Sequence, residues 1–182
     1  MPARPFSIYT IGHSTHPIGE FVAMLHAYRV EQLVDIRSIP KSRHNPQFQQ
    51  SELEQSLPAA GVAYCYMKQL GGLRHSLKDS VNKGWRNTSF RGYADYMQSC
   101  DFKQAVQELI RYAANQPTAI MCAEAVPWRC HRSLVGDALL VRGIDVIDIF
   151  SATNSKPHAL TKWARVDGEH VTYPPDGSES EA

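Results

Sequence analysis

The chain has 182 residues, of which 43% are hydrophobic and 20% are charged, and its formal net charge is +1. This length and composition are typical of one globular domain, and the low net charge excludes a strong overall attraction to nucleic acid or membranes. No apolar segment approaches the roughly 18 residues that a membrane-spanning helix needs.

The N-terminal sequence also lacks an apolar segment followed by a small-residue cleavage site, so we expect no secretory signal and a cytoplasmic protein. Four cysteines stand at positions 65, 100, 122 and 130. In a reducing cytoplasm they are expected to be free thiols, metal ligands or reactive groups rather than a disulfide framework.

The first part of the chain alternates between predicted strands and helices. Runs of β-branched and aromatic residues predict the strands, and apolar residues at helical spacing predict the helices. The predicted strands cover 6–13, 31–37 and 62–67, with one helix after Pro17 and another over 51–61 that Gly61 closes.

A long loop over 70–88 interrupts this alternation. It is rich in Gly, Ser, Asn and cations, and loops of this length are often functional lids or are disordered. The alternation then resumes with helices over 89–98, from Asp101 and over 131–142, and with strands over 117–123, 144–150 and, weakly, 170–173.

Strands that alternate with helices predict right-handed crossovers and a mostly parallel sheet. We therefore expect a single three-layer α/β domain over residues 1–173, with about five strands flanked by helices on both faces. Residues 174–182 are expected to form a disordered acidic tail. A closed eight-fold barrel would need about 250 residues.

Ligands of open parallel sheets bind beyond the carboxyl ends of the strands. Four of the predicted strands end in polar or glycine-rich segments that would meet at this edge. The candidate site residues there are His13, Ser14, Asp35, Arg37, Ser42, Arg43, Gly71, Gly72, Cys122, Glu124, Cys130, His131 and Arg132.

Cys130 stands just before or at the start of the helix predicted over 131–142, beside cationic side chains, where a thiolate is favoured. It is a candidate nucleophile or redox thiol, with Cys122 as resolving partner and Glu124 or His13 as acid or base. The alternative for each of the two cysteines is an inert packed residue. This arrangement resembles rhodanese-like and tyrosine-phosphatase-like sites, but the spacing argues against their Cys-x5-Arg loop, because the residue six positions after Cys122 is Trp128 and the one six positions after Cys130 is Gly136.

Two further interpretations of the same residues remain open. In one, Zn²⁺ is bound by Cys122, by Cys130 and by either His131 or His13. The spacing Cys-x7-Cys-His differs from that of a zinc knuckle, so zinc is not favoured. In the other, the arginines and the helix N-terminus hold a phosphate or carboxylate, and the thiols take no part. No P-loop or dinucleotide-binding motif is present.

The two carboxylates at strand ends, Asp35 and Glu124, have two interpretations. Each is a candidate general acid or base, and each is also placed to form a salt bridge that holds Arg37 or Arg132 in position. For Asp35 the salt bridge is favoured, whereas for Glu124 the sequence favours neither.

Four motifs in order resemble the bacterial and archaeal family known as domain of unknown function 488. They are Thr10–Ser14, Asp35–Arg43, Leu70–Gly72, and Met121–Glu124 followed by Cys130–Arg132. The resemblance runs from about residue 7 to 150 and implies a stand-alone cytosolic α/β domain. It implies no activity, and it places the thirteen candidate site residues among the family motifs.

The favoured hypothesis is an enzyme, a hydrolase or group transferase, acting on a small anionic substrate that is phosphorylated or nucleotide-like. Cys130, Glu124, Cys122 and His13 would carry the chemistry, and the other nine candidates would bind the substrate under the 70–88 loop. No cofactor and no oligomeric state is predicted.

Two alternatives belong to other functional classes. Residues 37–91 hold nine Lys or Arg but only three acids, and the aromatic residues Phe90, Tyr93 and Tyr96 lie at the end of this basic segment. Together they favour a nucleic-acid-binding or accessory module. A thiol or metal sensor built on Cys122 and Cys130 is the other alternative. Trp85 and Trp128 are candidates for a pocket wall or an interface.

Overall fold

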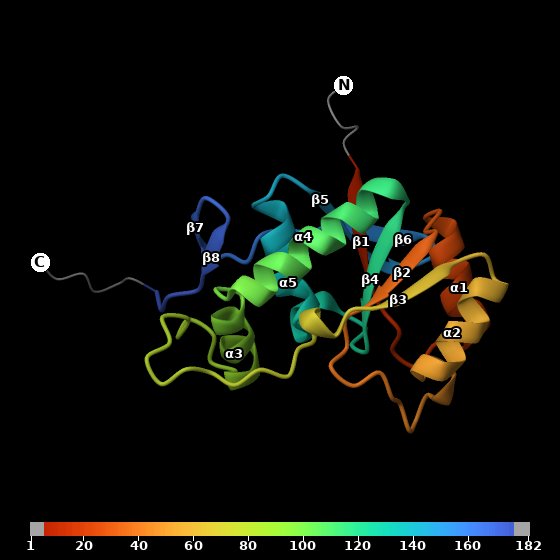
Figure 1. The fold of residues 1–182 in the computed structure, drawn as a ribbon, viewed down its shortest axis with the longest axis horizontal. Helices are drawn as coiled ribbons and strands as arrows, with labels where there is room; N and C mark the ends of the chain where they lie inside the picture. The colour runs from red at the N-terminus through yellow and green to blue at the C-terminus, as the bar shows by residue number, and fades with distance from the viewer. Residues whose placement is uncertain (1–5, 177–182) are drawn as a thin grey trace, which may run out of the picture.

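A computed structural model describes residues 6–176, which form an α/β fold (Figure 1). The predicted boundary at residue 1 and most of the predicted acidic tail, residues 177–182, lie outside the described residues. The strands are β1 Ser7–Gly12, β2 Gln32–Asp35, β3 Ala63–Tyr66, β4 Thr118–Cys122, β5 Asp145–Ser151, β6 Asn154–Pro157, β7 Arg165–Asp167 and β8 His170–Thr172. The α-helices are α1 Ile18–Ala27, α2 Gln50–Ala59, α3 Thr88–Tyr96, α4 Cys100–Asn115 and α5 Arg132–Leu140.

The main sheet has six strands in the order β3-β2-β4-β1-β5-β6. The first five are parallel, and β6 runs antiparallel to β5 at the edge. Gly12 on β1 lies beside Cys122 on β4, and Asp35 on β2 lies beside Met121. Because these three strands end in register, the chain leaves the sheet at one common edge after each of them.

The helices cover both faces of the sheet, as the alternating pattern predicts. The chain passes through α1 and α2 as it runs from β1 to β2 and β3, toward one edge of the sheet, and through α3, α4 and α5 as it runs from β3 back to β4 and β5. Because right-handed connections in opposite directions along a sheet lie on opposite faces, the two sets of helices cover opposite faces. Two separate buried clusters match this division. One contains Phe21, Leu25 and Leu53 with Ile11 and Met121, and the other contains Val106, Leu109 and Leu134 with Ile8 and Ile120.

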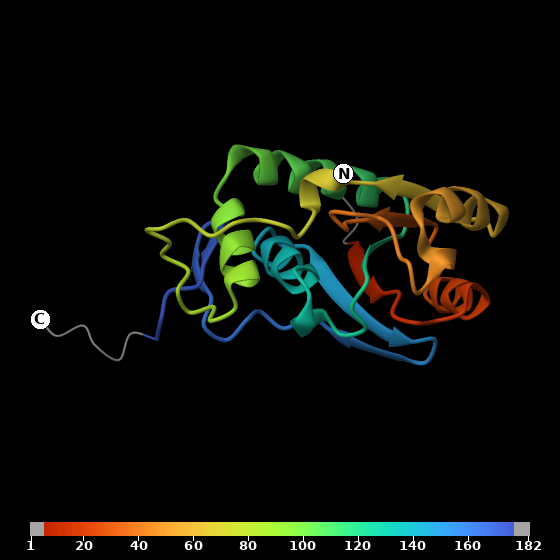
Figure 2. The same ribbon diagram turned by 90° about the horizontal axis from the view of Figure 1, so that it is seen from below.

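The single α/β fold with a mostly parallel sheet is confirmed, and each predicted strand and helix has its counterpart in the structure. The structure adds β6 and β7, which the apolar pattern does not predict. The weak strand over 170–173 corresponds to β8, but β8 pairs with β7 in a separate hairpin instead of joining the sheet. In both views this hairpin and α3 lie at the opposite end of the molecule from α1 and α2 (Figure 2).

The long loop between β3 and α3 is fixed in place by the buried carboxylate of Asp95 on α3. This carboxylate accepts hydrogen bonds from the backbone N–H of Leu77 at 2.8 Å, the hydroxyl of Ser80 at 2.6 Å and the amide of Asn82 at 2.7 Å. Asn82 in turn accepts a hydrogen bond from the backbone of Tyr173 at 2.8 Å. These bonds tie the loop to α3 and to the C-terminal segment, which argues against disorder in it.

A buried histidine anchors the segment that follows β6. His158 lies 2.9 Å from Asp148 on β5 through Nδ1 and 3.0 Å from Asp137 on α5 through Nε2. Burial alone would lower the pKa of His158, but the hydrogen bonds and charges of the two carboxylates outweigh burial and raise it to about 9. Gly136 leaves room for this ring, because a Cβ there would lie 2.8 Å from its Nε2.

Candidate functional site

A cavity of about 900 Å³ opens at the carboxyl edge of the sheet, around the end of β4. The neighbours of β4 are β1 and β2, whose connections leave toward α1 and α2, whereas β4 itself leads to α5 on the other face. Open α/β sheets bind their ligands at such a switch point. Nine of the thirteen candidate residues line the cavity: His13, Ser14, Arg37, Ser42, Gly72, Cys122, Glu124, Cys130 and His131.

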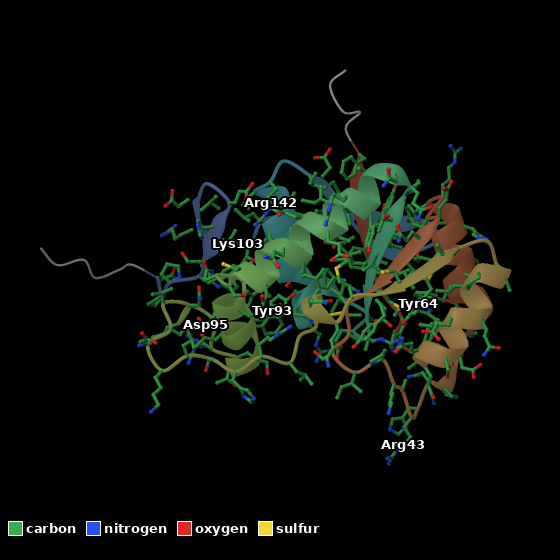
Figure 3. The ribbon with its side chains drawn as sticks, viewed as in Figure 1. Arg43, Tyr64, Tyr93, Asp95, Lys103 and Arg142 are labelled. Atoms are coloured by element: carbon green, nitrogen blue, oxygen red, sulfur yellow. A yellow bond between two sulfur atoms is a disulfide. The ribbon has the colours of Figure 1, made fainter. Side chains whose placement is uncertain are left out.

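The other four candidates do not line the cavity. Asp35 and Arg132 are completely buried behind its wall, and Gly71 is buried against Ser38. Arg43 is exposed and points away from the body of the molecule on the loop after β2 (Figure 3). The geometry therefore does not support direct contact between a ligand in the cavity and any of these four residues.

Arg37 enters the cavity wall with most of its donors already used. Its Nε lies 2.9 Å from Oδ1 of Asp35 and one terminal nitrogen 2.7 Å from Oδ2, and the same nitrogen donates to the carbonyl of Phe48 at 2.8 Å. The hydroxyl of Tyr64 also donates to Asp35, at 2.6 Å. Asp35 thus has the salt-bridging role that the sequence favours, and it orients the remaining nitrogen of Arg37.

His13 is buried between Arg37 and Phe48. Its Nδ1 lies 2.8 Å from the carbonyl oxygen of Ser14, its Nε2 lies 3.3 Å from the free terminal nitrogen of Arg37, and its ring stacks on Phe48. Since a carbonyl only accepts and a guanidinium only donates, Nδ1 carries the proton and Nε2 the lone pair. Burial is the main reason that the pKa of His13 falls to about 4, so the ring is neutral at pH 7.

The two cysteines of the site are joined as a disulfide, Cys122 at the end of β4 and Cys130 just before α5. Both line the cavity, and both are nearly buried. The prediction that the cysteines form no disulfide framework is correct for Cys65 and Cys100, which are free, but it does not hold for this pair. The reason is that α5 starts beside the end of β4, so the two sulfurs meet.

His131 presents a hydrogen-bond acceptor to the sulfur of Cys130. Its Nε2 lies 2.9 Å from the carbonyl oxygen of Ile36, and its Nδ1 lies 3.5 Å from the sulfur of Cys130. Because the carbonyl requires a donor, Nε2 carries the proton and Nδ1 presents a lone pair to the sulfur. Burial, with a smaller effect of the Arg132 charge, lowers the pKa of His131 to about 4, so this tautomer is neutral at pH 7.

Arg132 supports the cysteines from behind the cavity wall. Its backbone N–H donates to the sulfur of Cys130 at 3.4 Å, and its guanidinium donates to the carbonyl of Glu124 at 3.3 Å. The sulfur of Cys122 lies 3.9 Å from that same carbonyl. Burial lowers the pKa of Arg132 to about 10, which leaves the side chain cationic at pH 7. The guanidinium of Arg132 therefore holds the loop after β4 in position.

The cavity also contains polar side chains that the sequence analysis did not select. Lys41 is an exposed cation within the second motif, and Arg129 is an exposed cation next to Cys130. Ser38 holds the loop after β3 by accepting a hydrogen bond from the backbone of Leu73 at 2.8 Å. Asn87 and Ser89, at the start of α3, line the cavity as well. Lys41 follows from its place in the second motif and Arg129 from its place beside Cys130, whereas no sequence signal connects the start of α3 with this site.

The aromatic residues after the long loop serve packing. Tyr93 is fully buried in the core, and the guanidinium of Arg74 lies 3.5 Å over the ring of Tyr96. Phe90 lines the cavity but stacks on Trp85, with ring centroids 4.8 Å apart. Base stacking on Tyr93 is therefore not supported, which weakens the nucleic-acid alternative.

Two properties of the described residues bear on the other functional classes. Within residues 6–176, no three or more His, Cys, Asp or Glu side chains are grouped closely enough to bind a metal ion. In the same part of the chain, none of the helices has the length and the apolar character that crossing a membrane requires. A zinc site built on both cysteines and a histidine thus gains no support.

The fold and the cavity together define a doubly wound α/β protein with a candidate site at a topological switch point. The chain belongs to the family described as Domain of unknown function DUF488, whose model matches residues 17–139. The resemblance found in the four motifs is therefore confirmed, although His13 and Ser14 precede the matched segment. No curated protein and no solved structure matches the chain.

Proposed function

We propose that the protein is an enzyme that uses Cys130 as the nucleophile in group transfer or hydrolysis on a small anionic substrate bound in the cavity. The observation that carries this proposal is the pairing of Cys130 with His131, whose Nδ1 lies 3.5 Å from the sulfur. A nucleophile, a base within reach, and a third group that orients the base are the usual signature of covalent catalysis. Here the carbonyl of Ile36 is that third group.

The proton and the charge of the reaction have defined places. After reduction of the disulfide, the thiol of Cys130 donates a hydrogen bond to Nδ1 of His131, which takes the proton as the sulfur attacks the electrophilic atom of the substrate. His131 then returns the proton to the leaving group, and water or a second acceptor takes the transferred group from the sulfur. The N-terminus of α5, through the backbone N–H of Arg132 at 3.4 Å, favours the thiolate.

Cations on the cavity wall support an anionic substrate. The exposed side chains of Lys41 and Arg129 supply positive charge, and the terminal nitrogen of Arg37 that does not bind Asp35 and the hydroxyls of Ser14 and Ser42 supply further donors. Few acidic side chains oppose them, because the carboxylate of Asp35 is buried and bound to Arg37. Glu124 is the acidic side chain that lines the cavity.

Alkylation of the reduced protein tests the nucleophile. Cys100 is exposed, whereas Cys130 is 7% exposed, so accessibility alone predicts faster alkylation of Cys100. We expect iodoacetamide to modify Cys130 faster at pH 7, as measured by peptide mass spectrometry, and we expect His131→Asn to slow only this reaction. Faster labelling of Cys100 in the wild-type protein would overturn the assignment.

Ligand binding tests the substrate class. We expect inorganic phosphate or a nucleoside monophosphate to raise the melting temperature, and we expect Lys41→Ala and Arg129→Ala each to weaken binding about tenfold, as for the loss of a charged hydrogen bond. Lys156→Ala, an exposed cation on β6 outside the cavity, is the matched control and should change nothing. Equal effects of all three substitutions would contradict an anion site in the cavity.

A further inference from the structure

We propose that Cys122 turns the site into a dithiol that reduces small anionic disulfides. This inference rests on the proposed function, because it uses Cys130 as the attacking thiol and the same cations to hold the substrate. It is carried by the direct contact of the two sulfurs on the cavity wall, where Cys122 and Cys130 form a disulfide. Cys65 and Cys100 lie outside the cavity and take no part.

The position of Cys122 restricts the kind of group that Cys130 can carry. When an acyl or phosphoryl group is bound to Cys130, a second thiol attacks the carbon or phosphorus and merely takes over the group. When the group is bound through sulfur, a second thiol attacks the sulfur of Cys130 and expels the group as a thiolate. Only the second reaction produces the Cys122–Cys130 disulfide, so the contact between the sulfurs favours a substrate with a sulfur–sulfur bond.

The reaction then balances in two exchange steps. In the first, the thiolate of Cys130 attacks one sulfur of the substrate disulfide, which forms a mixed disulfide and releases one substrate thiolate. In the second, the thiolate of Cys122 attacks the sulfur of Cys130, and the other substrate thiolate leaves. The two protons of the protein dithiol pass to the two released thiolates, and two electrons pass from protein to substrate. An external dithiol is the reductant that restores the starting state.

The surroundings of the two sulfurs assign their roles. The sulfur of Cys130 accepts a hydrogen bond from the backbone N–H of Arg132 at 3.4 Å, which favours its thiolate, and it has Nδ1 of His131 at 3.5 Å to take its proton during the attack. Cys122 is 2% exposed, at the end of a buried strand, and contacts the carbonyl of Glu124. It is shielded from a substrate but lies beside Cys130, as the resolving thiol requires.

The wall of the cavity assigns the charge of the substrate. The exposed cations Lys41 and Arg129 line the same cavity as the two sulfurs. An anionic disulfide is attracted to this space, whereas a cationic disulfide is repelled. Electrostatic attraction of this kind changes association rates by tenfold or more and weakens as salt is added.

The test compares disulfides of opposite charge on the reduced full-length protein, in a background where Cys65→Ser and Cys100→Ser remove the other thiols. The probes are oxidised glutathione, which is anionic, and cystamine, which is cationic. We expect oxidised glutathione to form the Cys122–Cys130 disulfide about tenfold faster than cystamine at low salt. In Cys122→Ser the reaction should stop at a mixed disulfide on Cys130, whereas Cys130→Ser should form neither product.

Three outcomes would overturn the inference. In the first, Cys130→Ser forms a mixed disulfide on Cys122 as fast as Cys122→Ser forms one on Cys130. In the second, oxidised glutathione and cystamine react at equal rates. In the third, Cys122→Ser forms no mixed disulfide. The anion-binding and alkylation measurements of the proposed function do not depend on Cys122. If those two measurements give the expected results but no mixed disulfide forms, disulfide reduction is rejected and the proposed function stands. If those two measurements also fail, the proposed function and disulfide reduction are both rejected.

Discussion

The guanidinium of Arg37 is held by both carboxylate oxygens of Asp35, with Nε 2.9 Å from Oδ1 and a terminal nitrogen 2.7 Å from Oδ2. The backbone N–H of Arg37 donates to Oδ1 as well, at 3.1 Å. Asp35 is completely buried and Arg37 is 6% exposed, so water does little to screen this pair. Asp35 therefore acts on the cavity through Arg37 and is a positioning residue.

Asp35→Asn should consequently destabilise the protein strongly. The substitution leaves the Arg37 cation buried without a counter-charge, and breaking a buried ion pair in this way costs about 3–5 kcal/mol. Tyr64→Phe is the matched control, because it removes the 2.6 Å hydrogen bond to Asp35 but keeps the ion pair, and should cost about 1–2 kcal/mol. Urea unfolding measures both values. A loss of less than about 1 kcal/mol in Asp35→Asn would contradict the assigned role.

The main features of the fold could be predicted because its central strands are apolar and its helices carry clear apolar stripes. β1, β2 and β4 are almost continuously buried. β6 could not be predicted, because the edge strand Asn154–Pro157 is polar and is held by its pairing with β5 and not by an apolar face. The same holds for β7, whose three residues are all exposed.

The candidate site could be predicted only as a set of positions at one edge of the sheet. Parallel strands ending in register bring His13, Arg37 and Cys122 together, and this follows from the order of elements. The direction of each side chain does not follow from it. Arg132 is completely buried behind the wall, and the loop after β3 reaches the cavity through its hydrogen bonds to Ser38. Such details depend on packing between segments far apart in the sequence.

Gly72→Ala should disturb the contact between Cys130 and His131. A Cβ at position 72 would lie 2.5 Å from Nδ1 of His131, so the imidazole must move away from its place beside the sulfur. We expect slower alkylation of Cys130 and a loss of stability of about 1–3 kcal/mol, as for other overpacked sites. Gly19→Ala, on α1, is the control, because a Cβ there meets no atom within 4 Å. Unchanged alkylation in Gly72→Ala would contradict the role of His131.

His13 and His131 should make the protein less stable on the acid side. Burial lowers both pKa values from 6.5 to about 4, so between these limits the unfolded chain binds more protons than the folded one. Stability is therefore lost as the pH falls from 6.5 to 4. Carboxylates contribute in the same range, so the readout is the difference between wild type and variant. We expect His13→Gln to show a shallower loss in urea unfolding between pH 7 and 4.5. Parallel curves would contradict the prediction.

His158 should have the opposite effect on the alkaline side. Burial would lower its pKa, but hydrogen bonds to Asp137 and Asp148 raise it to about 9 from 6.5, so the folded protein binds more protons than the unfolded chain between these values. Its contribution is thus fully present below pH 6.5 and is lost as the pH rises through 9, by an amount on the order of 3 kcal/mol.

Unfolding free energies measured from pH 6.5 to 9.5 check this prediction. His158→Gln should be less stable than the wild type at pH 6.5, and the difference should shrink toward pH 9.5. Thr10→Val is the matched control, because it removes the hydrogen bond from Thr10 to Asp148 but keeps both contacts of the histidine. It should lower stability and keep the wild-type slope. A His158→Gln profile that runs parallel to the wild type would show that the imidazole is not charged in the folded protein.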